Sequence, residues 1–326
     1  MRGEPSAGDS ILVTGAGGQI GSELVPALRK RFGDARVIAT DVRDLGTRLG
    51  TPFQVLDCTD GDSVLELTRS EQVGTIYHLA ALLSVTAEAN PQKAYAVNMG
   101  SVVAVLEAAR KCGASVFAPS SIGAFGPGTP RDETPQDSLQ RPITMYGVTK
   151  VAGELLCDYY HLKFGVDSRG VRFPGLISHV AEPGGGTTDY AVDMLRAAAA
   201  GRGYTCYLEP DTQIDMMYMP DAVRAALELM AADATRLIHR NAFNVAAVRL
   251  TPARLAEEIA LHVPGFIVDY EVDADRQAIA DSWPRGVDDS AAREEWGWKP
   301  SFGLAAIVED MLEQLPARGQ PQLGGT

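Results

Sequence analysis

The stretch ILVTGAGGQIG, residues 11 to 21, decides the fold. Its first four residues, ILVT, are typical of a buried strand, and Gly15, Gly18 and Gly21 follow around a helix that begins near Gln19. Glycines at such a junction permit a tight turn and let an anion approach the first amides of the helix, those of Gln19 and Ile20. The stretch therefore predicts a phosphate-binding turn between a strand and a helix.

An acidic residue follows at the distance expected for a dinucleotide site. Asp41 ends the next strand-like run, RVIATD, twenty residues beyond Gly21. A carboxylate there accepts hydrogen bonds from the adenosine ribose and repels a 2′-phosphate, which favours NAD over NADP as the cofactor. Arg43 weakens this preference for NAD, because its guanidinium could bind the 2′-phosphate of NADP if the side chain turned inward. The alternative interpretation is a structural glycine turn beside an unrelated surface aspartate.

Short β-branched runs alternate with helical periods as far as Gly170. The runs are ILVTG, RVIATD, FQVLD, TIYHLA, SVFAPS and VDSRGVRF, separated by segments such as ELVPALRKRF and SVVAVLEAAR. This alternation indicates an α/β fold, a doubly wound parallel sheet of Rossmann type with helices on its faces.

After Pro174 the sequence becomes richer in glycine and proline, with helices expected at 189–200, 220–232, 252–262 and 303–314. We expect residues 1–174 to form an NAD-binding domain to which 217–245 return. Residues 175–216 and 246–316 then form a smaller, partly interleaved substrate domain. Residues 317–326 have the composition of a flexible tail.

The composition is that of a globular protein with an acidic surface. Of the 326 residues 45% are hydrophobic, and 29 basic and 42 acidic side chains give a formal net charge of -13. A chain of this charge is a poor partner for a phosphate backbone, so we expect no nucleic-acid partner. The sequence has no apolar run of about 18 residues for a membrane span, and MRGEPSAGDS is too polar for a signal peptide. We therefore expect a cytoplasmic protein.

The cysteines and histidines show no pattern of metal ligands. The four cysteines form no C-x-x-C pair and favour structural thiols; they are Cys58, Cys112, Cys157 and Cys206. The five histidines, at 78, 161, 179, 239 and 262, have no H-E-x-x-H spacing. We expect no metal site.

MYGVTK, residues 145 to 150, places a phenol and an ammonium group four positions apart in a predicted helix. Tyr146 and Lys150 then lie on the same helical face, where the lysine charge can act on the phenol. Alone this pattern is more often a solvated helix surface than a catalytic pair, so its weight depends on what accompanies it.

The glycine spacing G-x-x-G-x-x-G, together with positions further along, resembles the extended short-chain dehydrogenase/reductase superfamily. The matching positions, in order, are Asp57 in VLDCTD, HLAA at 78 to 81, Asn98 in VNMGSV, Ser121 in APSS, then Tyr146 and Lys150. The resemblance implies that Asp57 contacts the adenine, that Leu79, Ala80 and Ala81 line the cofactor, and that Asn98 distorts its helix. Taken singly, each is equally well a turn, surface or loop-cap residue.

The resemblance also implies a division of chemical labour at the catalytic residues. Tyr146 is expected to be the general base, although a free phenol with a pKa of about 10 needs roughly 4 kcal/mol to ionise near neutral pH. Lys150 and the positive nicotinamide of NAD favour the phenolate, and the Ser121 hydroxyl hydrogen-bonds the reacting oxygen. No histidine has a motif-level relation to these residues, so a nucleophilic triad is not expected.

Longer strings in the second half resemble one family of that superfamily, the short-chain type L-threonine 3-dehydrogenases. They are FPGLIS, PGGGTTDYAVDM, MMYMPDAVRAALELM, FNVAAVRLTPARLAEEI and RQAIADSWPRGVDDSAAREEWGWKP. The family implies oxidation of L-threonine at C3 by NAD, giving 2-amino-3-ketobutyrate in threonine catabolism, without zinc. It also places Leu176 of FPGLIS at the cofactor. Gly123 departs from the family, where a bulkier residue is usual, and is expected to loosen the serine loop.

Several residues are candidates for the substrate. Gly186, Thr187 and Thr188 lead into a helix, where backbone amides and hydroxyls can hold an α-carboxylate, although Thr188 as a simple helix cap is the alternative. Ser84, after the cofactor-lining strand, is a second candidate for the carboxylate or amine. Trp283 is expected to wall the pocket or merely to pack in the core. Ser121 and Tyr146 complete the set by contacting the hydroxyl. The MMYM segment, 216 to 219, fits the core.

Two other functions share the cofactor motifs. A nucleotide-sugar epimerase or dehydratase needs the same glycines, serine, tyrosine and lysine, and differs only in the second domain. A regulator that binds NAD without catalysis is the other, although such proteins commonly lose the tyrosine or lysine. Apolar helices around 96–110 and 147–160 favour a homodimer, with burial inside the monomer as the alternative.

Overall fold

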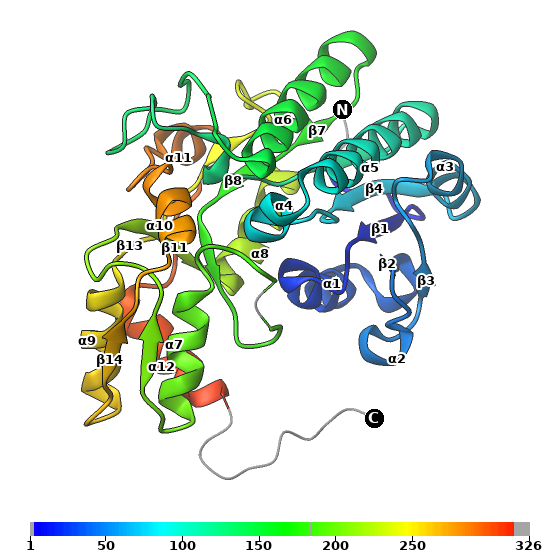
Figure 1. Cartoon of the computed structure of the whole chain (residues 1–326). Coiled ribbons are helices and arrows are strands. Elements are labelled where there is room, and N and C mark those ends of the chain that lie inside the picture. The colour runs from blue at the N-terminus through cyan, green and yellow to red at the C-terminus, as the bar shows by residue number, and fades with distance from the viewer. Residues whose placement is uncertain (1–2, 183, 316–326) are drawn as a thin grey trace.

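The computed structural model describes residues 3–182 and 184–315. A parallel sheet of six strands in the order β3-β2-β1-β4-β5-β7 confirms the expected α/β fold of Rossmann type (Figure 1). Its strands are β1 Ser10–Thr14, β2 Val37–Asp41, β3 Phe53–Val55, β4 Val73–His78, β5 Ser115–Phe117 and β7 Ser168–Arg169. The expected tail, 317–326, lies outside the described residues.

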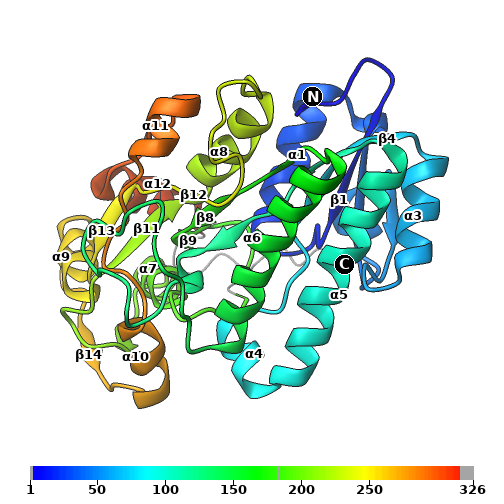
Figure 2. The same cartoon turned by 90° about the horizontal axis from the view of Figure 1, so that it is seen from above.

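Helices cover both faces of this sheet. One face carries α1 Gln19–Phe32 and α8 Met219–Ala231, and the other carries α3 Gly61–Ser70, α5 Pro91–Cys112 and α6 Met145–Phe164. Figure 2 shows α5 and α6 side by side on their face. Shorter elements connect them: η1 Asp34–Arg36, α2 Gly46–Leu49, α4 Ser84–Ala89 and η2 Ile122–Ala124.

Successive residues of β1 enter two separate cores, because side chains alternate across a strand. Leu12 packs with residues of α3, α5 and α6, among them Val105. Ile11 and Val13 pack with residues of α1 and α8, among them Leu24. All are fully buried or nearly so, which accounts for the unbroken apolar run at the start of the fold-determining stretch.

The two longest helices begin and end at residues suited to those positions. α5 starts at Pro91 after Asn90, whose side chain caps the helix, and α6 starts after Thr144, whose hydroxyl accepts from the Gly147 amide. Both end at a glycine in the left-handed region, with φ of 75° at Gly113 and 72° at Gly165.

Two runs that the sequence presents as single strands each divide between two sheets. SVFAPS forms β5 and then β6, Ser120–Ser121, and VDSRGVRF forms β7 and then β8, Val171–Phe173. β6 and β8 pair in a second sheet of order β12-β8-β6, with β12 at Phe243–Asn244. The break falls at Gly170, where a Cβ would collide with the Ala118 carbonyl oxygen.

The remaining elements form the smaller C-terminal part, which lies on the left side of Figure 1. They comprise a sheet of order β13-β11-β9, a pair β10-β14, and five helices. Four of these helices pack around a common core, and the fifth, Ser290–Trp296, packs through Ala292 with the core beneath the large sheet. The strands are β9 Gly175–Ile177, β10 Tyr204–Cys206, β11 Ile214–Tyr218, β13 Val248–Leu250 and β14 Val268–Tyr270; the helices are α7 Tyr190–Ala199, α9 Pro252–His262, α10 Ala274–Asp281, α11 Ser290–Trp296 and α12 Leu304–Gln314. The four helices expected after Pro174 are confirmed, whereas α10 and α11 were not expected.

The MMYM segment is core, as expected, and it joins the two parts. Met216 and Tyr218 pack in the C-terminal core, while Met217 and Met219 pack beneath the large sheet. All four are fully buried. Because α8 follows directly and packs against α1, this arrangement supports the proposal that 217–245 belong with the cofactor-binding part.

Within residues 3–182 and 184–315, the structure contains no helix that is both long and apolar enough to cross a membrane.

Candidate active site

The glycine turn leaves room for an anion at the start of α1. Gly15 has φ of 64°, and a Cβ there would lie 2.7 Å from the backbone nitrogen of Ala80. Gly21 is as constrained, since its Cβ would lie 2.5 Å from the Ala16 carbonyl oxygen. No side chain caps α1 at Gly18. The first turn of α1 is thus a helix start without a side-chain cap, closely backed by the loop after β4.

Asp41 lies over this turn at the carboxyl end of β2. Its Oδ2 accepts from the Gly17 amide at 3.1 Å, and its Oδ1 accepts from the Arg43 amide and Nε at 3.1 Å and 3.2 Å. The Arg43 side chain is 64% exposed and pairs with this carboxylate. The Asp41 carboxylate therefore holds both the glycine turn, through Gly17, and the Arg43 guanidinium.

Other predicted cofactor residues lie on three segments: the loop after β4, the segment after β3, and β9. Leu79 donates its amide to the Thr14 carbonyl oxygen at 3.1 Å, which places Ala80 and Ala81 beside the glycine turn. Asp57 is exposed, and its Oδ1 accepts from the amide and hydroxyl of Thr59. Leu176 lies in β9.

Asn98 does not distort its helix, because α5 runs unbroken through it. Its side chain instead ties three elements together. Oδ1 accepts from the Leu82 amide at 2.8 Å, and Nδ2 donates to the Leu82 carbonyl oxygen and to the Thr149 hydroxyl, both at 3.1 Å. Asn98 thus fixes the loop after β4 against α6, the helix that carries Tyr146 and Lys150.

Ser121, Tyr146 and Lys150 come together where β6 meets the first turns of α6. Burial raises the pKa of Tyr146 to about 12, and a hydrogen bond from Ser121 opposes that rise. Lys150 Nζ lies 5.5 Å from the centre of the Tyr146 ring and donates to the Pro119 carbonyl oxygen at 2.8 Å. Burial lowers the pKa of Lys150 to about 8, with the Glu154 charge acting against the change.

Gly123 supports the serine rather than loosening its loop. Its amide donates to the Ser121 oxygen at 3.1 Å. A Cβ at this position would lie 3.3 Å from two carbons of the Tyr146 ring, which is a tight contact. Glycine here gives the tyrosine ring room beside a serine that is held by a hydrogen bond.

His78 is buried between two hydroxyl groups, at 2.8 Å from Thr14 Oγ1 and 3.3 Å from Ser101 Oγ. Burial, with a smaller effect of the Lys150 charge, lowers the pKa of His78 to about 3. It is therefore a neutral structural imidazole, consistent with the expectation that no histidine serves as a catalytic base.

The predicted substrate residues lie on two segments that touch. The Ser84 and Thr187 hydroxyl oxygens are 3.3 Å apart, and the Val85 amide donates to the Gly185 carbonyl oxygen at 3.3 Å. Ser84 and Thr187 are both buried, from the start of α4 and the loop before α7. Two residues about a hundred positions apart in sequence thus form one hydroxyl pair.

Two amides of the glycine loop are not free to bind a substrate carboxylate, contrary to the expectation from the sequence. The amides of Gly185 and Gly186 donate to Asp189 Oδ2 at 2.9 Å and 2.7 Å, so these donors are already engaged by a carboxylate of the chain. Thr188 is not the helix cap either, because that position is Asp189 and no side chain caps α7 there.

Trp283 packs in the core cluster that includes Ile122 and Phe125, the residues just after Ser121. Its Nε1 is buried and has no hydrogen-bond partner in the described part of the chain. Trp283 lies just before residues 285–288, which are bonded to residues 131–134 in the loop between Ser121 and Tyr146.

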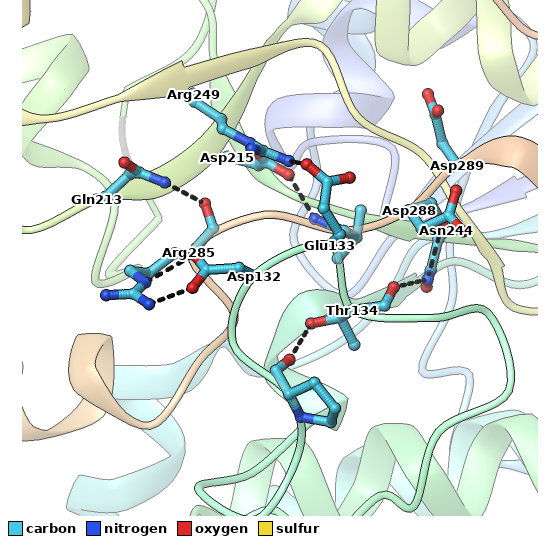
Figure 3. Close-up of polar contacts among 12 residues, drawn as sticks. Asp132, Glu133, Thr134, Gln213, Asp215, Asn244, Arg249, Arg285, Asp288 and Asp289 are labelled. Carbon is cyan, nitrogen blue, oxygen red and sulfur yellow. Dashed lines mark hydrogen bonds and ion pairs between the residues drawn. The ribbon is translucent and has the colours of Figure 1, made fainter.

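Figure 3 shows this connection, which we call the strap: residues 131–134 held against residues 285–288. Thr134 and Val287 form a parallel bridge, Arg285 pairs with Asp132, and Arg249 pairs with Glu133. Asp215 accepts from the Val287 amide at 2.9 Å. The strap thereby ties residues 285–288 to the loop between Ser121 and Tyr146.

The described residues contain no group of three or more His, Cys, Asp or Glu side chains suited to hold a metal ion. All four cysteines are free thiols.

Comparison with known proteins decides the family. A model described as the NAD dependent epimerase/dehydratase family matches residues 11–246. The chain belongs to this family. Its cofactor is NAD, in agreement with the sequence prediction.

Individual members of the family cover almost the whole chain. An uncharacterised epimerase/dehydratase of Staphylococcus haemolyticus is 51% identical over 316 residues, covering 96% of this chain and 99% of the relative. The crystal structure of L-threonine dehydrogenase from Clostridium difficile is 51% identical, covers 94% of this chain and 97% of its own, and has a TM-score of 0.92. The holo form of a GalE-like L-threonine dehydrogenase from Cupriavidus necator is 50% identical, with coverages of 93% and 99% and a TM-score of 0.91.

The structure offers NAD a fitting set of donors at the glycine turn. Gln19 Nε2 is buried without a hydrogen-bond partner among the described residues, at the first position of α1. A buried donor without a partner costs free energy, so a pyrophosphate oxygen is a natural acceptor for it. We propose that Gln19, Ile20 and the glycine turn hold the pyrophosphate, and that Asp41 takes the ribose hydroxyls.

The sequence analysis missed two features of the site. Asp189 engages the glycine-loop amides, and the only hint was a carboxylate three residues after Gly186. Glu154 is buried beside Lys150, and the hint was its spacing of four residues from that lysine, as Lys150 is from Tyr146.

Asp41 is expected to set the cofactor preference of this family member. Asp41→Ser removes the repelling carboxylate and frees the Arg43 guanidinium, so the ratio of kcat/KM for NADP to that for NAD should rise by about tenfold or more. Steady-state kinetics with both cofactors measure this ratio. Asp44→Asn, which removes an exposed carboxylate nearby, is the control and should leave it unchanged. Equal use of NADP by the wild type would contradict the assignment.

Proposed function

We propose that the protein oxidises L-threonine at C3 with NAD to give 2-amino-3-ketobutyrate and NADH, a zinc-independent step of threonine catabolism. The observation that carries this proposal is a tyrosine-lysine-serine group together with the Ser84 and Thr187 hydroxyl pair. Ser84 begins α4, and the neighbouring Leu83 and Ala87 pack in one cluster with Tyr146. Support also comes from neighbours at 50–51% identity that are L-threonine dehydrogenases.

In this proposal the chain's own residues position the substrate and move one proton. The hydroxyls of Ser84 and Thr187 hold the α-carboxylate, and Ser121 donates a hydrogen bond to the C3 oxygen. Tyr146 then takes the proton from that oxygen. NAD, when bound, accepts the hydride that leaves C3. The alcohol loses two electrons and two hydrogens, one as hydride and one as the proton on Tyr146, so the reaction balances.

Ionising Tyr146 costs more free energy in the structure than the sequence alone suggested. With a pKa of about 12, ionising Tyr146 near neutral pH costs about 7 kcal/mol, against roughly 4 kcal/mol for a free phenol. Lys150, one helical turn away, favours the phenolate when it carries a proton. The protonation state of Lys150 is therefore part of the proposed mechanism.

A nucleotide-sugar epimerase or dehydratase is the second candidate. The observation in its favour is that the Staphylococcus haemolyticus relative, which is 51% identical, is described as an epimerase/dehydratase. This candidate uses the same serine, tyrosine and lysine, so only substrate turnover separates the two. A regulator that binds NAD without catalysis is a third candidate, which the intact catalytic group disfavours.

Tyr146→Phe tests the acid-base role. Removing the phenol oxygen should lower kcat for NADH formation from L-threonine by roughly a thousandfold, because general-base catalysis contributes on that scale. NAD affinity, measured by a binding titration, should stay within about twofold, because the ring and Lys150 remain. Unchanged turnover would contradict the mechanism. If neither the wild type nor the variant turned over any substrate, the regulator interpretation would be favoured.

We also propose that two copies of the chain associate through α5 and α6. Large hydrophobic side chains are exposed along these helices, with Leu155 at 62% and Leu162 at 83%; the others are Tyr95, Val103, Val148, Tyr159 and Phe164. An apolar row of this kind on adjacent helices is suited to a two-fold interface.

Sedimentation tests this association. Replacing both Leu155 and Leu162 by Glu should convert a dimer into a monomer, since charges would enter an apolar interface. Leu261→Glu on α9, where the side chain is 76% exposed, is the control and should leave the dimer intact. A monomeric wild type at working concentrations would end the proposal.

A further inference from the structure

Glu154 is a buried carboxylate that the proposed acid-base steps do not use. It lies on α6 four residues after Lys150, which itself lies four residues after Tyr146. Residues spaced in this way share one helical face. The side chain is only 5% exposed, so its charge has been placed in the interior beside the catalytic pair.

The Glu154 carboxylate is fixed by several donors. Arg172 donates Nε to Oε1 at 3.0 Å and a terminal nitrogen to Oε2 at 2.9 Å, a two-point contact between planar groups. Gln140 Nε2 donates to Oε2 at 2.9 Å, and the Ser120 hydroxyl donates to Oε1. With both oxygens engaged by fixed donors, the side chain has little freedom to turn.

These contacts join the elements that carry the catalytic group. Ser120 and Arg172 face each other in the β6-β8 pair, in the register that also sets Ser121 opposite Phe173. One carboxylate on α6 thus contacts both strands of that pair. The position of Ser121 relative to Tyr146 therefore depends on Glu154.

The same carboxylate acts on the Lys150 charge. Glu154, Lys150 and Cys157 line one small cavity, together with His78 of β4 and Asn241. His78 is neutral, and burial raises the pKa of the Cys157 thiol to about 12, so neither supplies a charge near neutral pH. Glu154 is the nearby carboxylate that raises the pKa of Lys150 against the lowering caused by burial.

Two other charged groups near this cavity, Arg172 and Asp158, have partners of their own. Arg172 of β8 is engaged by Glu154, and Asp158, one turn beyond Glu154 on α6, accepts from Asn241 Nδ2 at 3.3 Å. Partial desolvation of its carboxyl group raises the pKa of Asp158, although the residue as a whole is solvent-exposed.

We propose that Glu154 is a positioning residue whose carboxylate, fixed by Arg172, keeps Lys150 in its ammonium form and holds the Ser120–Ser121 strand against α6. This inference rests on the proposed dehydrogenase function for its kinetic consequence, but its electrostatic part concerns only residues of the chain. A buried ion pair is seldom a source of stability compared with apolar side chains of similar size, so a role in tuning a neighbour is a distinct hypothesis.

The titration of Lys150 tests the electrostatic part directly. The sequence contains only six lysines, so side-chain NMR of protein labelled at lysine follows each one, and Lys150→Met assigns the signal. In Glu154→Gln the titration midpoint of Lys150 should fall by about one pH unit, since a neighbouring opposite charge typically shifts a pKa by that much or more. Asp158→Asn, the matched control one turn further along, should leave it in place.

The kinetic consequence has a defined sign. The ammonium form of Lys150 is lost as pH rises through its pKa, so a lower pKa moves the alkaline loss of kcat to lower pH. In Glu154→Gln we expect that limb to shift by the same amount as the NMR midpoint, which is about a tenfold loss of kcat at a pH above both midpoints. KM for L-threonine should stay within about twofold. A purely structural effect would lower activity evenly across pH.

Glu154→Gln also leaves the Arg172 guanidinium without its partner, which can prevent folding. The double variant Glu154→Gln with Arg172→Gln removes both charges, and the Lys150 midpoint should still fall, because it is Glu154 whose charge acts on this lysine. An unchanged midpoint in a folded variant would overturn the proposal. A shifted midpoint in a protein that does not oxidise threonine would overturn the proposed function alone.

Discussion

The site depends on the close approach of backbone segments at the carboxyl ends of β1 and β4. Gly15 lies so near Ala80 that no side chain fits between them, and Gly21 lies equally near Ala16. This contact sets the start of α1 at the point where the strand order departs in two directions, which is where ligands bind in open α/β sheets. It also fixes the loop after β4, which Asn98 then ties to α6. The glycine turn and the helix that carries Tyr146 and Lys150 are therefore connected through the same loop.

The sequence was sufficient for the fold because the signals for it are local. The alternation of apolar runs and helical periods, and the glycines at 15, 18 and 21, are each readable within a few residues. The breaks within SVFAPS and VDSRGVRF were not predictable, since each strand changes sheet where Gly170 meets the Ala118 carbonyl, and that contact joins distant parts of the chain.

In the candidate site, too, the residues recognisable from local patterns were predicted, whereas contacts between distant segments were not. Tyr146, Lys150 and Ser121 were found by spacing and resemblance, and the structure brings them together. The Ser84 and Thr187 contact was foreseen only as two separate candidates, because nothing in the sequence shows that α4 touches the loop before α7. The engagement of the Gly185 and Gly186 amides by Asp189 was missed, since a glycine-rich loop has the same sequence whether its amides are free or already bonded.

Charge balance inside α6 connects these observations. A buried phenol resists ionisation and a buried amine resists protonation, so a phenolate at Tyr146 beside an ammonium group at Lys150 is unfavourable without further charges. Glu154 supplies a negative charge behind Lys150, and Arg172 prevents that carboxylate from becoming an unpaired buried ion. Of the three residues spaced four apart on α6, Glu154 thus favours the charged form of Lys150, and charged Lys150 in turn favours the phenolate of Tyr146.

The most direct test of the central claim is NADH formation with L-threonine, compared with D-threonine, L-allo-threonine and a UDP-hexose under the same conditions. We expect turnover of L-threonine with NAD and little turnover of the other three. Turnover of UDP-glucose or UDP-galactose with threonine inert would contradict this expectation and would assign the same catalytic group to a nucleotide-sugar substrate.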